Sequence, residues 1–294
     1  MVDAVNISDS NILDNSILVR NTRIGEGIPK ICVPLVAKTE ENIVSAVEAI
    51  MNSEPDIIEF RADYMINYIC KETNDTFNGY LEKETEDSSG SNTSCMTKAK
   101  KKLLEVLEII RDHIGDKVLL FTIRTKGEGG EADINVDDYV DINRTACESG
   151  YIDLVDVEAF IEDGTLTKIG EIARSNGIYV VGSNHDFHKT PNEEEILRRL
   201  KYMGDNGADI VKIAVMPNSP EDVLTILSAT VKYKRSAEAK PVITISMGSI
   251  GVISRLSGEV FGTAVTFAAA GVSSAPGQLP ADEVRNILKV LHKY

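Results

Sequence analysis

Positively charged residues are scarce in this sequence. Its 294 residues include 31 lysines and arginines against 46 aspartates and glutamates, so the formal net charge is −15 at pH 7. A surface of this sign repels phosphate groups, which argues against binding to nucleic acid or to an anionic membrane. A small anionic ligand remains compatible with this charge only where arginines and lysines gather locally.

The sequence also lacks long apolar runs and paired cysteines. No apolar run approaches the ~20 residues of a membrane-spanning helix, and the opening MVDAVNISDSNILDN lacks the basic and apolar regions of a signal peptide. The four cysteines, Cys32, Cys70, Cys95 and Cys147, are widely spaced and form no CxxC pair. We therefore predict a cytoplasmic protein with reduced thiols, and with neither a disulfide framework nor a zinc site.

Short β-branched apolar runs recur along the chain and alternate with stretches of helical periodicity, such as ENIVSAVEAIMNS. The apolar runs lie at residues 31–36, 56–63, 118–125, 152–160, 179–187, 209–217, 241–249 and 263–271. Eight strand–helix units in about 260 residues predict an α/β fold, the closed (β/α)8 TIM barrel. A doubly wound open sheet is the alternative, but the first strand-to-helix turn lacks the glycine-rich dinucleotide loop that such folds often carry.

Two segments depart from this rhythm within what we predict to be a single catalytic domain, residues 1–294. Residues 1–30 precede the first run, and we expect part of them to pair as short strands or to close the barrel bottom, with residues 1–21 as an N-terminal extension. Residues 71–100 are rich in Ser, Thr, Asn and Glu, which predicts a polar, mobile insertion after the second strand. Because this insertion follows the carboxyl end of a strand, it is placed to cover the barrel mouth.

The alternation of side chains along each run separates the barrel interior from the helix side. In DIVKIAVMP, residues 209–217, the β-branched residues share the helix side, so Lys212 points into the barrel. In DIIEFRAD, residues 56–63, the same rule turns Glu59, Arg61 and Asp63 inward. Applied to the other runs, it turns inward Thr122 and Arg124, Asp156 and Glu158, Ser183 and His185, and Thr244 and Ser246.

Eight ionisable side chains from five strands are thus predicted to enter one barrel interior. Barrel interiors are normally filled by branched aliphatic side chains, and an unpaired buried ion costs several kcal/mol. A structural ion-pair network is the simpler interpretation and would suffice for Glu59, Arg61 and Asp63 alone. Because the charges come from five strands and several lie near strand ends, we favour an active site.

Lys212 has three plausible roles: a structural counter-ion, a clamp for a phosphate or carboxylate, or a nucleophile that forms an imine. A lysine must lose its proton before it attacks a carbonyl. Partial burial near other cations favours the neutral amine, and Arg61, Arg124 and Arg255 are predicted to share the barrel interior. The lysine alone does not decide among these roles.

His185 is the companion that favours catalysis. It ends the strand next to that of Lys212, on the same face, within SNHDFHKTP at residues 183–191. An imidazole beside an amine suits the removal of a proton next to a carbonyl that the amine has captured. His188 lies three residues on and faces the other side, so the two histidines make a poor chelate and we predict no metal site.

Two loops add polar groups to this face. RTKGEGGE, residues 124–131, follows the third run and brings Glu128 beside Arg124. GEGG is a weak signal for a phosphate-binding loop, because glutamates flank its glycines. GVSSAPGQ, residues 271–278, follows the last run and has the composition of a mobile flap over the barrel mouth.

The motifs EFRAD, FTIRTKGEGGE, SNHDFHKTP, VKIAVMP, GVISRLSGEVFG and SAPGQ occur in this order along the chain. As an ordered set over residues 22–294, they resemble the type I 3-dehydroquinate dehydratases of the shikimate pathway. The resemblance implies a (β/α)8 fold, no metal or organic cofactor, and commonly a homodimer. The chain departs from the family in its N-terminal extension, in the insertion and in GSIG at residues 248–251.

Carried over by motif, Lys212 resembles the Schiff-base lysine, His185 the general acid and base, and Glu128 the acid that orients the histidine. In the same way, Arg255, Ser274 and Gln278 match groups that hold the substrate carboxylate and ring oxygens. The remaining substrate-binding positions match Glu59, Arg61 and Arg124.

The implied reaction is the syn elimination of water from 3-dehydroquinate, a small anion, to give 3-dehydroshikimate. Lys212 would capture the C3 ketone, and His185 would remove a C2 proton and return it to the departing hydroxyl. Two other classes stay open on the residues alone. A class I aldolase would share the barrel and the lysine but commonly binds phosphate, whereas a sensor of small carboxylates would need Arg255 but no neutral lysine.

Overall fold

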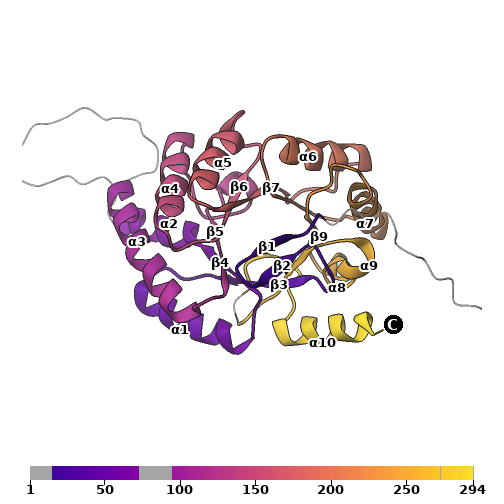
Figure 1. The fold of residues 1–294 in the computed structure, drawn as a ribbon, viewed down its shortest axis with the longest axis horizontal. Coiled ribbons are helices and arrows are strands. Elements are labelled where there is room, and N and C mark those ends of the chain that lie inside the picture. Colours follow the sequence, from indigo (N-terminus) through magenta and orange to yellow (C-terminus); the bar gives the residue numbers. More distant parts are fainter. Residues whose placement is uncertain (1–14, 73–94, 272, 294) are drawn as a thin grey trace, which may run out of the picture.

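Eight parallel strands form a (β/α)8 barrel in the structure of the protein, a computed structural model that describes residues 15–72, 95–271 and 273–293 (Figure 1). All eight apolar runs form barrel strands, which confirms the predicted fold. The strands are β3 (Lys30–Leu35), β4 (Ile57–Arg61), β5 (Val118–Thr122), β6 (Leu154–Glu158), β7 (Tyr179–Asp186), β8 (Ile210–Val215), β9 (Val242–Ser246) and β10 (Val265–Phe267). Their order in the sheet follows the chain, and a bridge between Val242 and Thr263 closes the ring between β9 and β10.

Helices surround this barrel and pack on the outward faces of its strands (Figure 1). The longer ones are α1 (Glu40–Asn52), α2 (Ala62–Glu72), α3 (Cys95–Ile114), α4 (Val136–Glu148), α5 (Thr165–Ser175), α6 (Glu193–Asp205), α7 (Pro220–Lys234) and α10 (Ala281–His292). The short ones are the 3-10 turn η1 (Lys126–Glu128), α8 (Val252–Leu256) and α9 (Gly258–Phe261). Among the helices that the structure describes, none combines the length and the apolar character that crossing a membrane requires.

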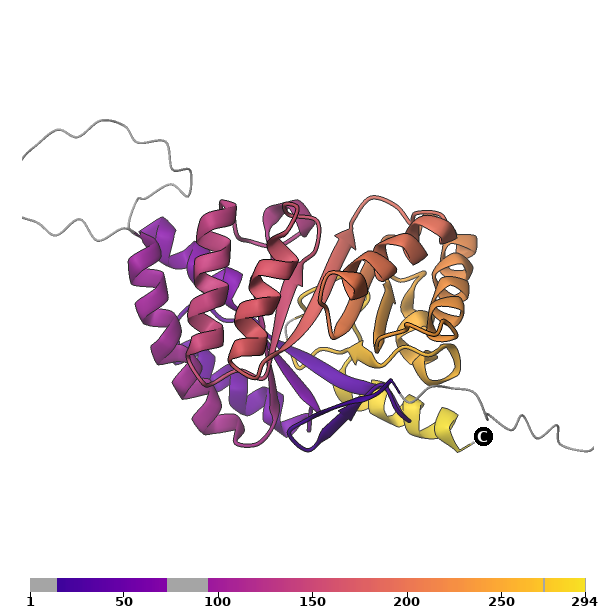
Figure 2. The same ribbon diagram turned by 45° about the horizontal axis from the view of Figure 1, so that its top comes forward.

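A short hairpin closes the amino-terminal end of the barrel. Strands β1 (Ile17–Val19) and β2 (Thr22–Ile24) pair antiparallel and lie beneath the barrel strands in Figure 2. Val19 and Ile24 are buried in one apolar cluster with Ile57 and Val118, the first residues of β4 and β5. The expected short strands at the barrel bottom are therefore confirmed, while residues 1–14 of the predicted extension lie outside the described residues.

The predicted alternation of side chains holds for β8 and fails for β9. Val211, Ile213 and Val215 pack in the cluster on the helix side, as expected. In β9, however, the Thr244 hydroxyl shares a hydrogen bond with that of Thr230 on α7 (2.7 Å). Ile245, the next residue along, lines the interior.

The inward orientation predicted for Thr244 and Ser246 was therefore wrong. The Ser246 amide donates to the Ser254 hydroxyl (3.0 Å), on the outer side of the strand. Threonine and serine occur on both faces of a strand, because a neighbouring hydroxyl or carbonyl can satisfy them when they are buried. Here Thr230 on α7 provides such a partner for Thr244, whereas the Ser246 hydroxyl has none among the described residues and only the backbone of Ser246 bonds to Ser254 on α8. The apolar residues of β9 face the cavity instead.

The polar insertion is shorter than predicted. Of residues 71–100, the first two end α2 and the last six begin α3, where Cys95 and Ala99 are buried. The predicted boundaries were therefore wrong at both ends. The remaining residues, 73–94, lie outside the described part of the chain.

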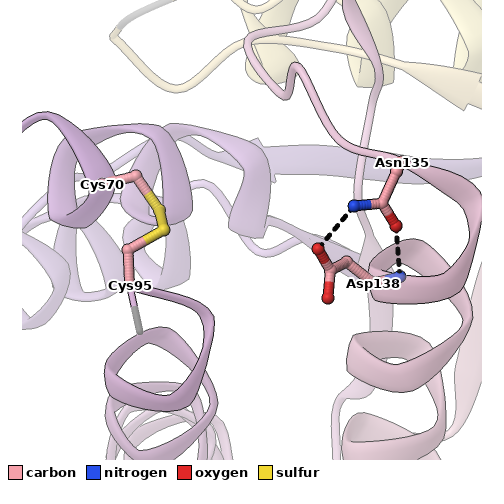
Figure 3. Close-up of a disulfide and its surroundings, with 4 residues drawn as sticks. All are labelled: Cys70, Cys95, Asn135 and Asp138. Atoms are coloured by element: carbon pink, nitrogen blue, oxygen red, sulfur yellow. Dashed lines mark hydrogen bonds between the residues drawn. A yellow bond between two sulfur atoms is a disulfide. The ribbon is translucent and has the colours of Figure 1, made fainter. Parts of the chain in front are cut away.

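A disulfide joins the two helices that flank this segment. Cys70 near the end of α2 and Cys95 at the start of α3 are bonded, with their Cα atoms 5.1 Å apart (Figure 3). The prediction of reduced thiols was wrong for this pair, while Cys32 and Cys147 are free and buried. A separation of 25 residues gives no local signal for such a bond, because only the side-by-side packing of α2 and α3 brings the two sulfurs together.

We expect reduction of this disulfide to lower the free energy of unfolding by about 3 kcal/mol, because the bond closes a loop of 25 residues and restricts the unfolded chain. Urea unfolding with and without dithiothreitol measures the difference. The double variant Cys70→Ser/Cys95→Ser should resemble the reduced protein and ignore the reductant. Equal midpoints for oxidised and reduced wild type would contradict this expectation.

Candidate active site

A cavity opens among the carboxyl halves of the barrel strands and the loops that follow them. This is the end of a TIM barrel where active sites are built. All nine residues predicted for the site line this cavity: Glu59, Arg61, Arg124, Glu128, His185, Lys212, Arg255, Ser274 and Gln278. Among the described residues, no three or more His, Cys, Asp or Glu side chains are arranged to hold a metal ion.

Lys212 lies at the floor of the cavity and is only 3% exposed. Its Nζ lies 3.0 Å from Asp156 Oδ2 and 3.7 Å from Glu59 Oε1, and it lies 4.5 Å from the centre of the Phe267 ring. Two carboxylates and an aromatic face therefore fix the amine from three sides. The lysine points into the interior, as the alternation along β8 predicts.

Asp156 is the anchor of this floor, and it was not among the predicted site residues. Its fully buried carboxylate accepts hydrogen bonds from Arg124 Nη2 (2.7 Å), Ser183 Oγ (2.6 Å) and Lys212 Nζ (3.0 Å). Burial alone would raise the pKa of this carboxyl, but the charges of Arg124 and Lys212 hold it well below its usual value. The inward alternation along β6 is the sequence signal that places Asp156 here.

The arginines near the lysine are paired with carboxylates of their own. Arg61 donates twice to Asp63, from Nε to Oδ1 (2.8 Å) and from Nη2 to Oδ2 (2.7 Å). Arg124 donates to Asp156 and, from Nη1, to Glu158 (3.0 Å). Much of each guanidinium charge is thus offset locally, which differs from the expectation that these arginines act directly on the amine.

Asp63 does not face the cavity with Glu59 and Arg61, so its predicted orientation was wrong. Strand β4 ends at Arg61 and helix α2 begins at Ala62, so strand alternation no longer applies to Asp63. From the first turn of α2, its buried carboxylate reaches back to the Arg61 guanidinium and also accepts the Glu131 amide (3.0 Å). The interpretation as a structural ion pair is therefore correct for Arg61 and Asp63.

His185 and Glu128 form a hydrogen-bonded pair at the rim. Nδ1 of the histidine lies 2.7 Å from Glu128 Oε2, and the same oxygen accepts the His185 backbone amide (3.0 Å). Burial lowers the pKa of His185 well below its usual value, and the charges of Arg124 and Lys212 lower it further. The imidazole is therefore neutral, and an ionised Glu128 selects the tautomer that keeps the proton on Nδ1 and a free electron pair on Nε2.

The protonation of Glu128 decides whether this tautomer is present. Burial and the neighbouring charge of Glu158 raise the pKa of Glu128 to about 8, against the opposing effects of Arg124 and Asn184. Below that pH the pair takes up one proton more, which removes the free electron pair on Nε2. The form of the pair that can accept a proton from a substrate therefore grows as the pH rises through about 8.

The GEGG turn positions Glu128 through tight packing. A Cβ atom on Gly129, whose φ is +79°, would lie 2.3 Å from Phe187 Cε2, and one on Gly130 would lie 2.1 Å from the Arg124 carbonyl oxygen. The amides of Glu128 and Gly130 both donate to the Thr125 carbonyl (3.1 and 2.8 Å). Because these amides are used within the turn, the turn does not form a phosphate cradle.

Arg255 carries a buried charge that no carboxylate offsets within the described residues. It is 2% exposed, and its guanidinium donates to two neutral carbonyls, those of Pro276 (2.9 Å) and Phe267 (3.4 Å). Its Nε finds no partner in the described part of the chain, and burial lowers the pKa of Arg255 to about 10. A buried cation without a counter-ion is a natural binding point for an anionic ligand.

The flap is docked against the end of β9. The Gly248 amide donates to the Pro276 carbonyl (3.2 Å), and a Cβ atom on Gly277 would lie 2.4 Å from the Gly248 carbonyl oxygen. Gln278 Oε1 accepts the Ser274 amide (2.9 Å), so these two predicted ligands are held together above the cavity. Gly277 therefore permits the close approach of the flap to the barrel.

The family model for type I 3-dehydroquinase matches residues 31–294. The chain belongs to the type I 3-dehydroquinase family. The family match covers all eight strands of the barrel apart from the first residue of β3, and every residue that lines the cavity.

Sequence relatives of this type I 3-dehydroquinase match nearly its whole length. The 3-dehydroquinate dehydratase of Bacillus velezensis is 44% identical over 279 residues, which cover 95% of this chain and 99% of the relative. The 3-dehydroquinate dehydratase of Salmonella typhimurium is 41% identical over 278 residues, which cover 95% of this chain and 99% of the relative.

Solved structures agree with this assignment. The 3-dehydroquinate dehydratase of Geobacillus kaustophilus superposes with a TM-score of 0.82 at 35% identity, over 97% of this chain and 99% of that one. The type I enzyme of Clostridium difficile, solved with covalently modified comenic acid, has a TM-score of 0.81 at 39% identity, over 95% and 98% of the two chains.

Proposed function

We propose that this type I 3-dehydroquinase is a hydro-lyase that dehydrates 3-dehydroquinate to 3-dehydroshikimate, a step of the shikimate pathway, through a Schiff base at Lys212. The observation that supports this proposal is the meeting of three groups in one cavity. An amine lies at its floor, a neutral imidazole paired with a carboxylate lies at its rim, and Arg255 offers a charge without a counter-ion. The Clostridium difficile relative was solved with covalently modified comenic acid, which supports covalent chemistry in this proposal.

The proposed reaction begins when Lys212, after giving up a proton, attacks the C3 ketone with Nζ and expels its oxygen as water. The nearest proton acceptors are the carboxylates of Asp156 and Glu59, at 3.0 and 3.7 Å. The iminium that results draws electrons from the adjacent C2–H bond, so that His185 Nε2 can remove the C2 proton. The C2–H electrons form an enamine, whose collapse expels the C1 hydroxyl, and the histidine returns its proton to form water.

Hydrolysis of the conjugated iminium then releases 3-dehydroshikimate and restores the amine. The same imidazole serves as base and acid on one face of the ring, which fits a syn elimination. The proposed role of Glu128 is to keep the proton of the histidine on Nδ1 during these transfers.

Substrate binding is proposed to centre on Arg255. Its guanidinium can meet the substrate carboxylate with two parallel hydrogen bonds, which explains how a chain of net charge −15 attracts an anion. The other cavity-lining polar groups are proposed to hold the ring oxygens: Glu59, Arg61, Arg124, Ser274 and Gln278. In the aldolase alternative, phosphate would have to bind near β9 and β10, where the cavity instead offers Arg255 and the flap.

The decisive test is to add 3-dehydroquinate to the purified protein and to follow the ultraviolet absorbance of the conjugated enone product. We expect the absorbance to rise with time, and the initial rate of this rise to be proportional to the protein concentration. Binding of 3-dehydroquinate without any rise would overturn the proposal in favour of a carboxylate sensor. Release of smaller carbon fragments, detected by mass spectrometry, would favour an aldolase.

A homodimer is the proposed assembly. Exposed apolar side chains lie on three neighbouring helices: Ile253 on α8, Val260 on α9, and Val290 and Leu291 on α10. A contact between His292 Nδ1 and Glu259 Oε1 (2.7 Å) joins α10 to α9 beside them. A second copy of the chain would bury this surface, and sedimentation at several concentrations tests the dimer.

A single catalytic domain and a location in the cytoplasm complete the proposal. All the helices and barrel strands of the described residues belong to one barrel, which supports one domain. The disulfide between Cys70 and Cys95 is unusual for a reducing compartment. Thiol labelling in intact cells would show whether this bond forms at the proposed location.

A further inference from the structure

Glu128 receives a hydrogen bond from outside the cavity. Its Oε1 accepts from Nδ2 of Asn184 (2.9 Å), while its other oxygen faces His185. Asn184 lies on β7 directly before the histidine, is 8% exposed and does not line the cavity. Its amide therefore supports the carboxylate without contact to a ligand bound there.

The orientation of this amide is set by an arginine on the next helix. Arg199 of α6 donates from Nη1 to Asn184 Oδ1 (2.9 Å) and from Nε to Glu195 Oε1 (2.7 Å). A guanidinium can only donate and an ionised carboxylate can only accept. If the amide turned over, its oxygen would face the carboxylate and its NH2 group would face the guanidinium. Arg199 thus leaves one orientation of Asn184 with both contacts satisfied.

We propose that Arg199 and Asn184 are positioning residues for the general base: Arg199 orients the Asn184 amide, and the amide favours the ionised form of Glu128 and directs its carboxylate at His185 Nδ1. This inference rests on the dehydration proposed above, in which His185 moves the proton. It extends the site by two residues that lie behind the cavity wall.

The charges around Glu128 make this donor important. Of the neighbouring charges, the carboxylates of Glu158 and Asp156 oppose ionisation of Glu128 and Arg124 favours it, and the Asn184 hydrogen bond lowers its pKa. The charged groups that face Glu128 and its histidine come from four strands or the segments directly after them: Arg61 on β4, Arg124 after β5, Asp156 and Glu158 on β6, and Lys212 on β8. Without the amide, the pKa of Glu128 rises further above its usual value, and the form of His185 with a free Nε2 becomes rarer at neutral pH.

The chain provides a matched control. Arg198 pairs with the same Glu195, from Nε to Oε2 (2.7 Å) and from Nη2 to Oε1 (2.8 Å), but its side chain is 59% exposed, and it is Arg199 that bonds to Asn184. Arg198→Met and Arg199→Met therefore each remove one guanidinium from the same glutamate. Only Arg199→Met removes the hydrogen bond that fixes the orientation of the Asn184 side-chain amide.

The experiment compares the dependence of kcat and KM on pH for wild type, Arg198→Met and Arg199→Met. We expect Arg199→Met to lower kcat about tenfold at neutral pH, the factor expected for one hydrogen bond to a charged group. KM should hardly change, and the acid limb of kcat/KM should move to higher pH, so that the loss shrinks as the pH rises. Arg198→Met should match wild type, and Arg199→Lys, which retains a donor, should recover most of the activity.

A second variant guards against an effect on folding. Asn184→Asp keeps the shape of the side chain and can pair with Arg199, but it offers Glu128 no N–H group, so it should move the acid limb in the same direction and further. Thermal unfolding of every variant shows whether the fold is kept. The inference is overturned if Arg199→Met and Arg198→Met give the same pH profile, or if the loss in Arg199→Met is uniform with pH. Absence of turnover by wild type would instead defeat the proposed function.

Discussion

Replacing Lys212 with alanine should abolish both turnover and the covalent adduct that borohydride traps when the protein meets 3-dehydroquinate. The reason is that the amine is the only group on the cavity floor that can condense with a ketone, among the residues that the structure describes as lining it. Loss of a covalent nucleophile removes a whole reaction path, so we expect kcat to fall by roughly four to six orders of magnitude.

The measurement is the intact mass of the protein after reduction with borohydride in the presence of 3-dehydroquinate. Wild type should gain the mass of one reduced ligand, and Lys212→Ala should gain none. Lys126→Ala provides the control, because Lys126 lies in the turn beside Glu128 but is 59% exposed and pairs with Asp133. An adduct that persists in Lys212→Ala would move the chemistry to another residue.

Replacing His185 with alanine should separate the two halves of the reaction. The amine remains, so the borohydride adduct should still form, while the removal of the C2 proton loses its base. General acid–base catalysis by one positioned side chain contributes roughly 10²–10⁴-fold, and here a single imidazole has both roles, so we expect a loss of turnover at the upper end of this range.

His188 supplies the matched control for this prediction. It lies three residues further along the same segment, but it is exposed and its side chain does not line the cavity. His188→Ala should therefore keep wild-type turnover and wild-type pH dependence. Undiminished turnover in His185→Ala would remove this residue from its proposed role, and loss of the adduct would show that it also assists imine formation.

The barrel could be predicted from the sequence because its signals are local. Each β-branched run is followed by a helical period, and the alternation along β8 alone turns Lys212 inward. The same alternation turned Glu59, Arg61, Arg124 and His185 inward, whereas Glu128 was expected from its loop and Arg255, Ser274 and Gln278 from the resemblance to the family. The structure places all nine around one cavity.

The failures share a different cause: they depend on contacts between segments far apart in the chain. Asp63 follows a strand that ends two residues earlier than the apolar pattern does, and Thr244 finds its partner on α7. The bond between Cys70 and Cys95 depends on the packing of two helices. Asn184 sits at an outward strand position, so nothing in its own segment shows that it reaches a glutamate on the turn after β5.

The hairpin at the amino-terminal end of the barrel has a consequence for how reactant and product enter and leave the cavity. Val19 and Ile24 are buried across that end, and among the described residues the cavity opens at the opposite face, so reactant, product and water enter and leave there. Product must leave the cavity before the next reactant binds there, so the two compete for one site. Inhibition by the product should accordingly be competitive, and its strength will limit how far the reaction proceeds when downstream consumption is slow.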